Sequence, residues 1–158
     1  MKISIFLIFF FYSNIIFAQS IKCNFEEVYK DGSIQKGLFL LKNDKLRYQY
    51  SDPNLFTLIF DNKKLYLTKN KDLLNSIEQS DNDNLIKSLM EIYQEYPNIK
   101  SKYIFNTYEV NIERNKNNKF IKRLSVKSNK INLSIYLIDC DFKPINDLFF
   151  RISPVFKY

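Results

Sequence analysis

Side chains that could support catalysis are few in this chain. It contains two cysteines, Cys23 and Cys140, and no histidine among its 158 residues. Histidine is the usual base beside a serine or cysteine nucleophile and a common zinc ligand. Its absence therefore excludes a Ser–His–Asp triad, a Cys–His pair and a histidine-based zinc site.

Carboxylates are the remaining candidates for acid–base or metal chemistry. Asp139, Asp141 and Asp147 surround Cys140, but the segment lacks the glycines and the close ligand spacing of a calcium loop, so we expect no metal there. No Asp or Glu stands in a sequence setting apolar enough to suggest a raised pKa. A two-carboxylate hydrolase stays open as an alternative, but the sequence favours a protein with no catalytic residue and no cofactor.

The two cysteines support two interpretations. In an exported chain Cys23 and Cys140 could form one disulfide. On a chain-entropy basis such a long loop closure stabilises the folded state by about 4–5 kcal/mol. The alternative is a pair of buried, reduced thiols, and the sequence leaves both open.

The N-terminus has the three-part pattern of a secretory signal peptide. A short basic start is followed by an apolar run over residues 3–17, and then by Ala18 and polar residues. This pattern predicts a cleaved signal peptide, residues 1–18, and one exported domain, residues 19–158. A retained anchor is the alternative, although the run is shorter than the ~20 residues that span a bilayer. Cys23 lies too far beyond the cut for a lipid anchor on the first mature residue.

The net charge of +7 comes from 24 Lys and Arg against 17 Asp and Glu. Acidic residues are dispersed among the basic ones, which is typical of an ordinary solvated surface. Basic and aromatic residues on the predicted strands could also bind single-stranded nucleic acid. The residues in question are Arg47, Tyr48, Tyr50, Lys63, Lys64 and Tyr66. Export argues against that partner, and we expect no nucleic acid and a monomer.

Most of the mature chain alternates between apolar and polar residues, which predicts β-strands. In residues 45–50, for example, Leu46, Tyr48 and Tyr50 share one face while Arg47 lies on the other. Gly37 marks a bulge or a close backbone approach. The predicted strands are residues 21–30, 34–41, 45–50, 55–60, 64–68, 103–105, 107–113, 120–126, 131–138 and 148–152.

One segment has helical periodicity instead. From Asp83, a candidate N-cap, apolar residues recur at helical spacing up to Tyr96, and Pro97 ends the run. The sequence therefore predicts a mainly β, α+β domain with a curved, incomplete antiparallel barrel. The helix must bury its apolar face, and the concave side of the sheet is available. That arrangement would enclose an apolar cavity; a solid core is the alternative.

Four segments, taken in order, resemble the periplasmic outer-membrane lipoprotein carrier (LolA) family. The most informative is Lys-Asn-Asp-Lys-Leu-Arg-Tyr-Gln-Tyr at residues 42–50, which is similar to the family's basic–Pro–Gly–basic–Leu–Arg–aromatic–x–Tyr. Residues 25–39, the hairpin at 59–66 and the closing segment at 144–154 are similar to other family segments. The resemblance covers nearly the whole mature chain, but Asn43 and Asp44 replace the family's Pro–Gly. The family's helix before the first strand also has no counterpart here.

The resemblance implies an open barrel with a helical lid over an apolar cavity. It also implies a periplasmic carrier that binds the acyl chains of lipoproteins and ferries them from the inner to the outer membrane. Its partners would be acylated lipoproteins, an inner-membrane ABC-type release complex and an outer-membrane lipoprotein receptor. The alternative is a periplasmic or surface protein-interaction module with a solid core.

Alternation and resemblance together select candidate site residues. Lys42 and Arg47 are candidates for a contact with the lid or with a partner, and for Arg47 a cross-strand surface role is the alternative. For the cavity residues the alternative is ordinary core packing. The candidates for the cavity are Phe39, Leu46, Tyr48, Tyr50, Leu58 and Phe60 on strands, and Ile86, Leu89, Met90 and Tyr93 on the helix.

Overall fold

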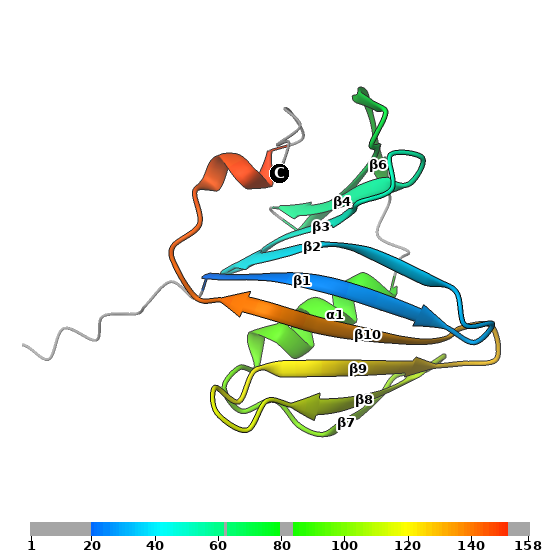
Figure 1. The fold of residues 1–158 in the computed structure, drawn as a ribbon, viewed down its shortest axis with the longest axis vertical. Helices are drawn as coiled ribbons and strands as arrows, with labels where there is room; N and C mark the ends of the chain where they lie inside the picture. Colours follow the sequence, from blue (N-terminus) through cyan, green and yellow to red (C-terminus); the bar gives the residue numbers. More distant parts are fainter. Residues whose placement is uncertain (1–19, 62, 80–83, 152–158) are drawn as a thin grey trace, which may run out of the picture.

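The computed structural model describes residues 20–61, 63–79 and 84–151. In these residues the chain forms ten strands, one α-helix and one 3-10 helix (Figure 1). The signal peptide predicted for residues 1–18 lies outside the described residues. The elements are β1 (Ser20–Tyr29), β2 (Ile34–Lys42), β3 (Lys45–Tyr50), β4 (Phe56–Asp61), β5 (Lys64–Lys69), β6 (Asp72–Gln79), α1 (Asn84–Gln94), β7 (Lys102–Ile104), β8 (Glu109–Arg114), β9 (Ile121–Lys127), β10 (Asn132–Asp141) and η1 (Asp147–Phe150).

All the strands join one antiparallel sheet in the order β6-β5-β4-β3-β2-β1-β10-β9-β8-β7. Consecutive strands pair with each other except β6 and β7, and β1 pairs with β10 at the centre of the sheet as well as with β2. The sheet is curved and does not close, because β6 and β7 form its two edges (Figure 1). The predicted open, curved, mainly β architecture with a helix is therefore confirmed at this level.

The strand alternation decides which side chains enter the core. In β3, Leu46, Tyr48 and Tyr50 are all at most 8% exposed and belong to the main apolar cluster, as the alternation predicts. In β2, Phe39 and Leu41 face the same cluster. The intervening Leu38 and Leu40 lie on the opposite face, in a second cluster.

Helix α1 begins and ends within the range that the periodicity predicts. Met90, Ile92 and Tyr93 are buried in the main cluster, whereas Lys87 and Glu91 are exposed. The helix thus buries one face against the sheet, as an amphipathic helix does. The predicted N-cap, Asp83, lies outside the described residues. Among the residues that the structure describes, no helix is long and apolar enough to cross a membrane.

Two expectations about elements were wrong. Residues 148–152 were expected to form a strand, but residues 147–150 form η1, because the Asn146 side chain accepts a hydrogen bond from the Leu148 amide and caps a helical turn. Ile145 and Phe150 from this segment cover Leu38 and Leu40 on the outer face of β2. Strand β6 was not expected, since Asp72–Gln79 has no sustained alternation.

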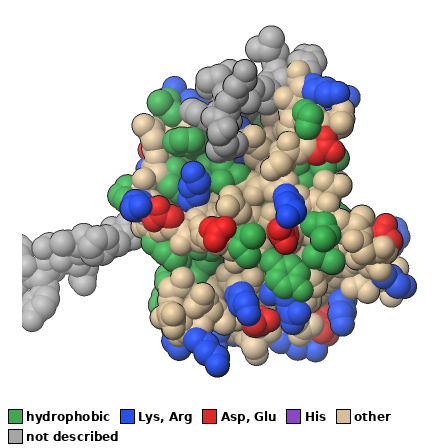
Figure 2. All heavy atoms as spheres, in the orientation of Figure 1, with side chains coloured by type: hydrophobic (Ala, Val, Ile, Leu, Met, Phe, Trp, Pro, Cys, Tyr) green, Lys and Arg blue, Asp and Glu red, His purple; other side chains and the backbone are tan. Residues whose placement is uncertain are grey.

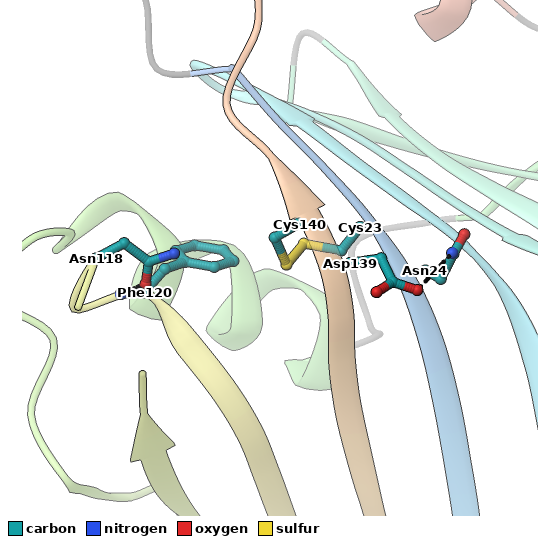
Figure 3. Close-up of a disulfide and its surroundings, with 6 residues drawn as sticks. All are labelled: Cys23, Asn24, Asn118, Phe120, Asp139 and Cys140. Carbon is teal, nitrogen blue, oxygen red and sulfur yellow. Dashed lines mark hydrogen bonds between the residues drawn. A yellow bond between two sulfur atoms is a disulfide. The ribbon is translucent and has the colours of Figure 1, made fainter. Parts of the chain in front are cut away.

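Cys23 and Cys140 form a disulfide between β1 and β10 (Figure 3). Cys23 faces the core in the β1 alternation and is fully buried. In β10 the register shifts near Asp139, which has a positive φ of 52°. This bulge reverses the alternation that buries Leu137, so that Cys140 turns inward to meet Cys23. The structure therefore supports the disulfide over the pair of reduced thiols.

The face of the sheet seen in Figure 1 carries mixed charge. Figure 2 shows Lys and Arg side chains lying among Asp and Glu side chains on this face. Ion pairs such as Lys36–Glu26 (2.6 Å) and Lys122–Glu113 (2.9 Å) join neighbouring strands. This mixture fits the solvated surface expected from the sequence.

Candidate functional site: an apolar pocket between helix and sheet

A pocket of about 240 Å³ lies between α1 and the sheet. Its walls are mainly aliphatic and aromatic side chains from both the strands and the helix. The strand residues are Glu27, Tyr29, Phe39, Leu46, Tyr48, Tyr50, Phe56, Leu58, Leu67, Val126, Leu133 and Ile135, and the helix residues are Leu85, Ile86, Leu89 and Tyr93. Such a lining suits an apolar ligand.

Eight of the ten residues suggested for a cavity line this pocket. They are Phe39, Leu46, Tyr48, Tyr50, Leu58, Ile86, Leu89 and Tyr93. The other two, Phe60 and Met90, lie elsewhere in the structure. Met90 is 2% exposed in the main cluster, and Phe60 is half-buried against that cluster. Both pack as core residues.

Aromatic rings form much of the β1–β3 wall. The rings of Phe25 and Tyr48 stack with centroids 3.9 Å apart, and Tyr50 meets Phe25 edge to face at 5.4 Å. Gly37 makes this stack feasible, because a Cβ there would overlap the ring of Phe25 and the carbonyl oxygen of Gln49. The close backbone approach suggested by Gly37 is therefore what the structure shows. From the helix, Tyr93 packs on Phe39 with centroids 5.0 Å apart.

One carboxylate enters this apolar wall. Glu27 is only 4% exposed, and its two oxygens accept hydrogen bonds from three tyrosine hydroxyls. Tyr48 donates to Oε1 at 2.7 Å, while Tyr29 and Tyr50 donate to Oε2 at 2.5 Å and 2.9 Å. The hydrogen bonds offset the cost of burying the acid.

Burial beside Glu27 also changes the pKa values of the tyrosines. Burial, followed by the hydrogen bond and negative charge of Glu27, raises the pKa of Tyr29 to about 12. Burial and then the charge of Glu27 also raise the pKa values of Tyr48 and Tyr50. Burial alone raises the pKa of Tyr93. These phenols are therefore neutral hydrogen-bond donors at ordinary pH.

The sequence interpretation did not select Glu27 as a site residue, although the structure buries it in the pocket wall. Ile21, Cys23 and Phe25 all face the core, and Glu27 continues the same period of two. A charged residue at an inward position of an alternating strand was the available signal. The alternation also contained Tyr29, which lines the pocket beside it.

Lys42 and Arg47 occupy the other face of the sheet. The Nζ of Lys42 donates to the carbonyl oxygen of Ile145 at 2.9 Å and pairs with Asp147 at 3.2 Å. Arg47 is 1% exposed and donates to the carbonyl oxygens of Phe149 at 3.0 Å and Arg151 at 3.4 Å. These positions do not fit a contact of either cation with α1 or a surface role for Arg47, while the contact with a partner stays a prediction. Through these contacts the two cations hold the C-terminal segment against β2 and β3.

The acidic residues near Cys140 do not converge. Asp139 accepts a hydrogen bond from Asn24, Asp141 pairs with Lys143, and Asp147 pairs with Lys42 and Lys45. Among residues 20–61, 63–79 and 84–151, no three His, Cys, Asp or Glu side chains group as metal ligands.

A scan against models of known protein families finds no match to this chain, and a search of curated proteins finds no significant match. A functional conclusion therefore depends on the pocket, on the four sequence segments and on the predicted export.

Proposed function

We propose that the protein is a periplasmic carrier that shelters the acyl chains of lipoproteins and ferries them from the inner to the outer membrane. The observation that carries the proposal is the apolar pocket between α1 and the sheet. The four family-like segments and the secretory pattern of residues 1–18 support the direction of transport and the compartment. The proposed partners are the inner-membrane release complex and the outer-membrane receptor that the resemblance implies.

The energetic requirement of a carrier fits an apolar pocket. Each CH₂ group of an acyl chain moved out of water contributes about 0.8 kcal/mol. Leu58, Leu89 and Tyr93 offer aliphatic and aromatic surface without a charge. Such contacts are non-directional, so they accept varied chains and release them to a membrane or a receptor.

The small size of the pocket leads us to propose that α1 moves during loading. At about 240 Å³ it is smaller than the ~300–1,000 Å³ of typical ligand sites. Four of its lining residues, Leu85, Ile86, Leu89 and Tyr93, come from α1. Outward displacement of this helix would enlarge the pocket, and its return would cover the chain. We propose this lid role for α1.

A charge placed at the helix side of the pocket tests the proposal. Ile86 lines the pocket and is half-buried, so Ile86→Asp puts a carboxylate beside the proposed chain at a modest cost in folding. An acidic residue in the first turn of α1 is also favoured by the helix dipole. Lys87→Asp, on the exposed face of the same turn, is the matched control.

The measurement is titration of each variant with a fluorescently labelled diacylated peptide, alongside thermal melting. We expect Ile86→Asp to lose at least about tenfold in affinity, equivalent to about 1.4 kcal/mol, while Lys87→Asp binds like the unmodified protein. Equal binding by folded Ile86→Asp would remove the pocket from the proposal. No binding by any form would favour the solid-core interaction module.

A further inference from the structure

In the cluster of Glu27, Tyr29, Tyr48 and Tyr50, every tyrosine hydroxyl proton is donated to Glu27. The hydroxyls of Tyr29, Tyr48 and Tyr50 each donate to a Glu27 oxygen. A phenol has one proton to donate, but its oxygen can still accept a hydrogen bond. Ionised Glu27 itself is acceptor-only, with about four acceptor positions. The cluster can therefore accept hydrogen bonds from a ligand.

The charge of the pocket also favours a neutral, hydrogen-bond-donating ligand group. Glu27 is the single charged side chain among the described residues that line it. An anionic ligand group here would meet a like charge in a largely apolar surrounding, with no cationic side chain among the lining residues to offset it. A neutral group that donates a hydrogen bond meets acceptors and no repulsion.

The cluster can be reached from the pocket. Glu27, Tyr29, Tyr48 and Tyr50 are all lining residues. Tyr29 is half-buried, whereas Tyr48 and Tyr50 are 7% and 8% exposed, so Tyr29 is the most open of the three phenols. Apart from the hydroxyl of Tyr93, the rest of the lining is apolar, so the part of a bound chain beside Glu27 has polar neighbours and most of the remainder does not. This asymmetry gives a ligand a preferred orientation.

We propose that the Glu27–tyrosine cluster is a selectivity site, which accepts acyl chains ending in an uncharged hydrogen-bond donor, such as an amide N–H, and rejects free fatty acids. The inference rests on the proposed carrier function and specifies its cargo class. A carrier with this site would distinguish amide-linked acyl chains from the carboxylates released by lipid turnover.

A matched pair of ligands tests the selectivity. Dodecanamide and dodecanoate share the same alkyl chain, and at about pH 8 the second is fully ionised. Both are titrated as competitors of a fluorescent neutral acyl-amide probe on the unmodified protein. We expect dodecanamide to bind at least about tenfold more tightly, because dodecanoate would bring a second carboxylate beside Glu27.

Two variants test whether the preference for dodecanamide over dodecanoate comes from the Glu27–tyrosine cluster. Glu27→Gln removes the charge and supplies an amide donor, so dodecanoate should gain about tenfold and the preference should largely disappear. Glu26→Gln removes the same charge from the next position of β1, where Glu26 pairs with Lys36 outside the pocket. The Glu26→Gln variant should prefer dodecanamide over dodecanoate to the same degree as the unmodified protein. If Glu27→Gln does not fold, Tyr29→Phe removes the most open acceptor and should weaken dodecanamide severalfold while dodecanoate stays excluded.

The outcomes separate this inference from the carrier proposal. Equal or tighter binding of dodecanoate by the unmodified protein would overturn the selectivity site while leaving an acyl-binding pocket. An unchanged preference in folded Glu27→Gln would also overturn it. If neither the probe nor either ligand binds, the carrier proposal itself fails.

Discussion

Neutral phenols surround Glu27, and their ionisation is coupled to folding. Tyrosines in the unfolded chain ionise near pH 10, whereas the pKa of Tyr29 is raised to about 12 and those of Tyr48 and Tyr50 are raised as well. A folded state that holds these protons more tightly loses stability as they leave. The contribution is fully present below about pH 10 and is lost as the pH rises toward 12.

We expect phenolate absorbance in an alkaline titration to rise in two phases. The pocket tyrosines ionise in the later phase, together with the loss of β-sheet circular dichroism. Tyr29→Phe should reduce the late phase, which assigns part of it to the cluster. Ionisation of every tyrosine near pH 10 with the sheet intact would contradict the buried environment of Glu27 and its partners.

At the residue scale, sequence reasoning succeeded where a side chain followed the period of its strand. The alternation in β3 placed Leu46, Tyr48 and Tyr50 on one face, and all three line the pocket. It did not find Glu27, since a Glu is ordinarily assigned to the solvent face. The three tyrosine donors that make its burial tolerable come from β1 and β3. Their convergence depends on strand register, which one strand alone does not reveal.

At the element scale, the C-terminal segment is held on the outer face of the sheet by partly buried hydrogen bonds. The guanidinium of Arg47 donates to the carbonyl oxygens of Phe149 and Arg151, and its Nε donates to Gln49 at 2.9 Å. Phe150 packs on Leu38 and Leu40 beside them. These contacts give Arg47 a structural role on the outer face of the sheet, away from the pocket.

Arg47→Ala should destabilise the fold by about 2–4 kcal/mol, because it removes charge-assisted hydrogen bonds and buried packing. Urea unfolding measures this loss, and limited proteolysis should show earlier cleavage in residues 143–151. Binding of an acylated peptide by the folded variant should stay near normal, since Arg47 faces away from the pocket. A selective loss of binding with unchanged stability would contradict this assignment.

Lys45→Ala is the matched control for that experiment. Lys45 lies two residues away in β3 and makes longer ion pairs, at 3.7 Å with Asp61 and 3.6 Å with Asp147. Partly exposed pairs of this kind contribute about 0–1 kcal/mol. The variant should therefore unfold close to the unmodified protein.

The boundaries of most elements could be predicted from sequence, because turn residues such as those at 43–44 and 61–63 interrupt clear alternation. Strand β6 was missed because its sequence lacks the apolar–polar alternation of a strand. Its pairing with β5, which the sequence does not reveal, forms the strand. Residues 148–152 were assigned to a strand because apolar residues cluster there. The cap at Asn146 and the packing of Phe150 on β2, a distant element, produce a helical turn instead.

At the scale of the whole molecule, β1 and β10 unite the two halves of the sheet. Their pairing joins residues more than a hundred positions apart, and the Cys23–Cys140 disulfide fixes the end of this ladder. The sequence left the Cys23–Cys140 disulfide and two reduced thiols both open, because the bulge at Asp139 that turns Cys140 inward is a feature of the strand register.

Reduction of the disulfide should lower the free energy of unfolding by up to about 4–5 kcal/mol, as expected for so long a loop. Urea unfolding with and without reductant measures the difference. Alkylation of the unfolded protein without reductant should label no cysteine. Two alkylated cysteines under those conditions would contradict the bond between β1 and β10.

The carrier proposal concerns the contents of the pocket in the cell. Native mass spectrometry of the protein, gently purified from the compartment to which the cell exports it, addresses this most directly. The unmodified protein should show a fraction with added mass that fragments to acylated peptide, and Lys87→Asp should retain it. Ile86→Asp should show the mass of the polypeptide alone. An unmodified protein with no acylated mass, or an equal bound fraction in Ile86→Asp, would contradict the central claim that this pocket carries lipoprotein acyl chains.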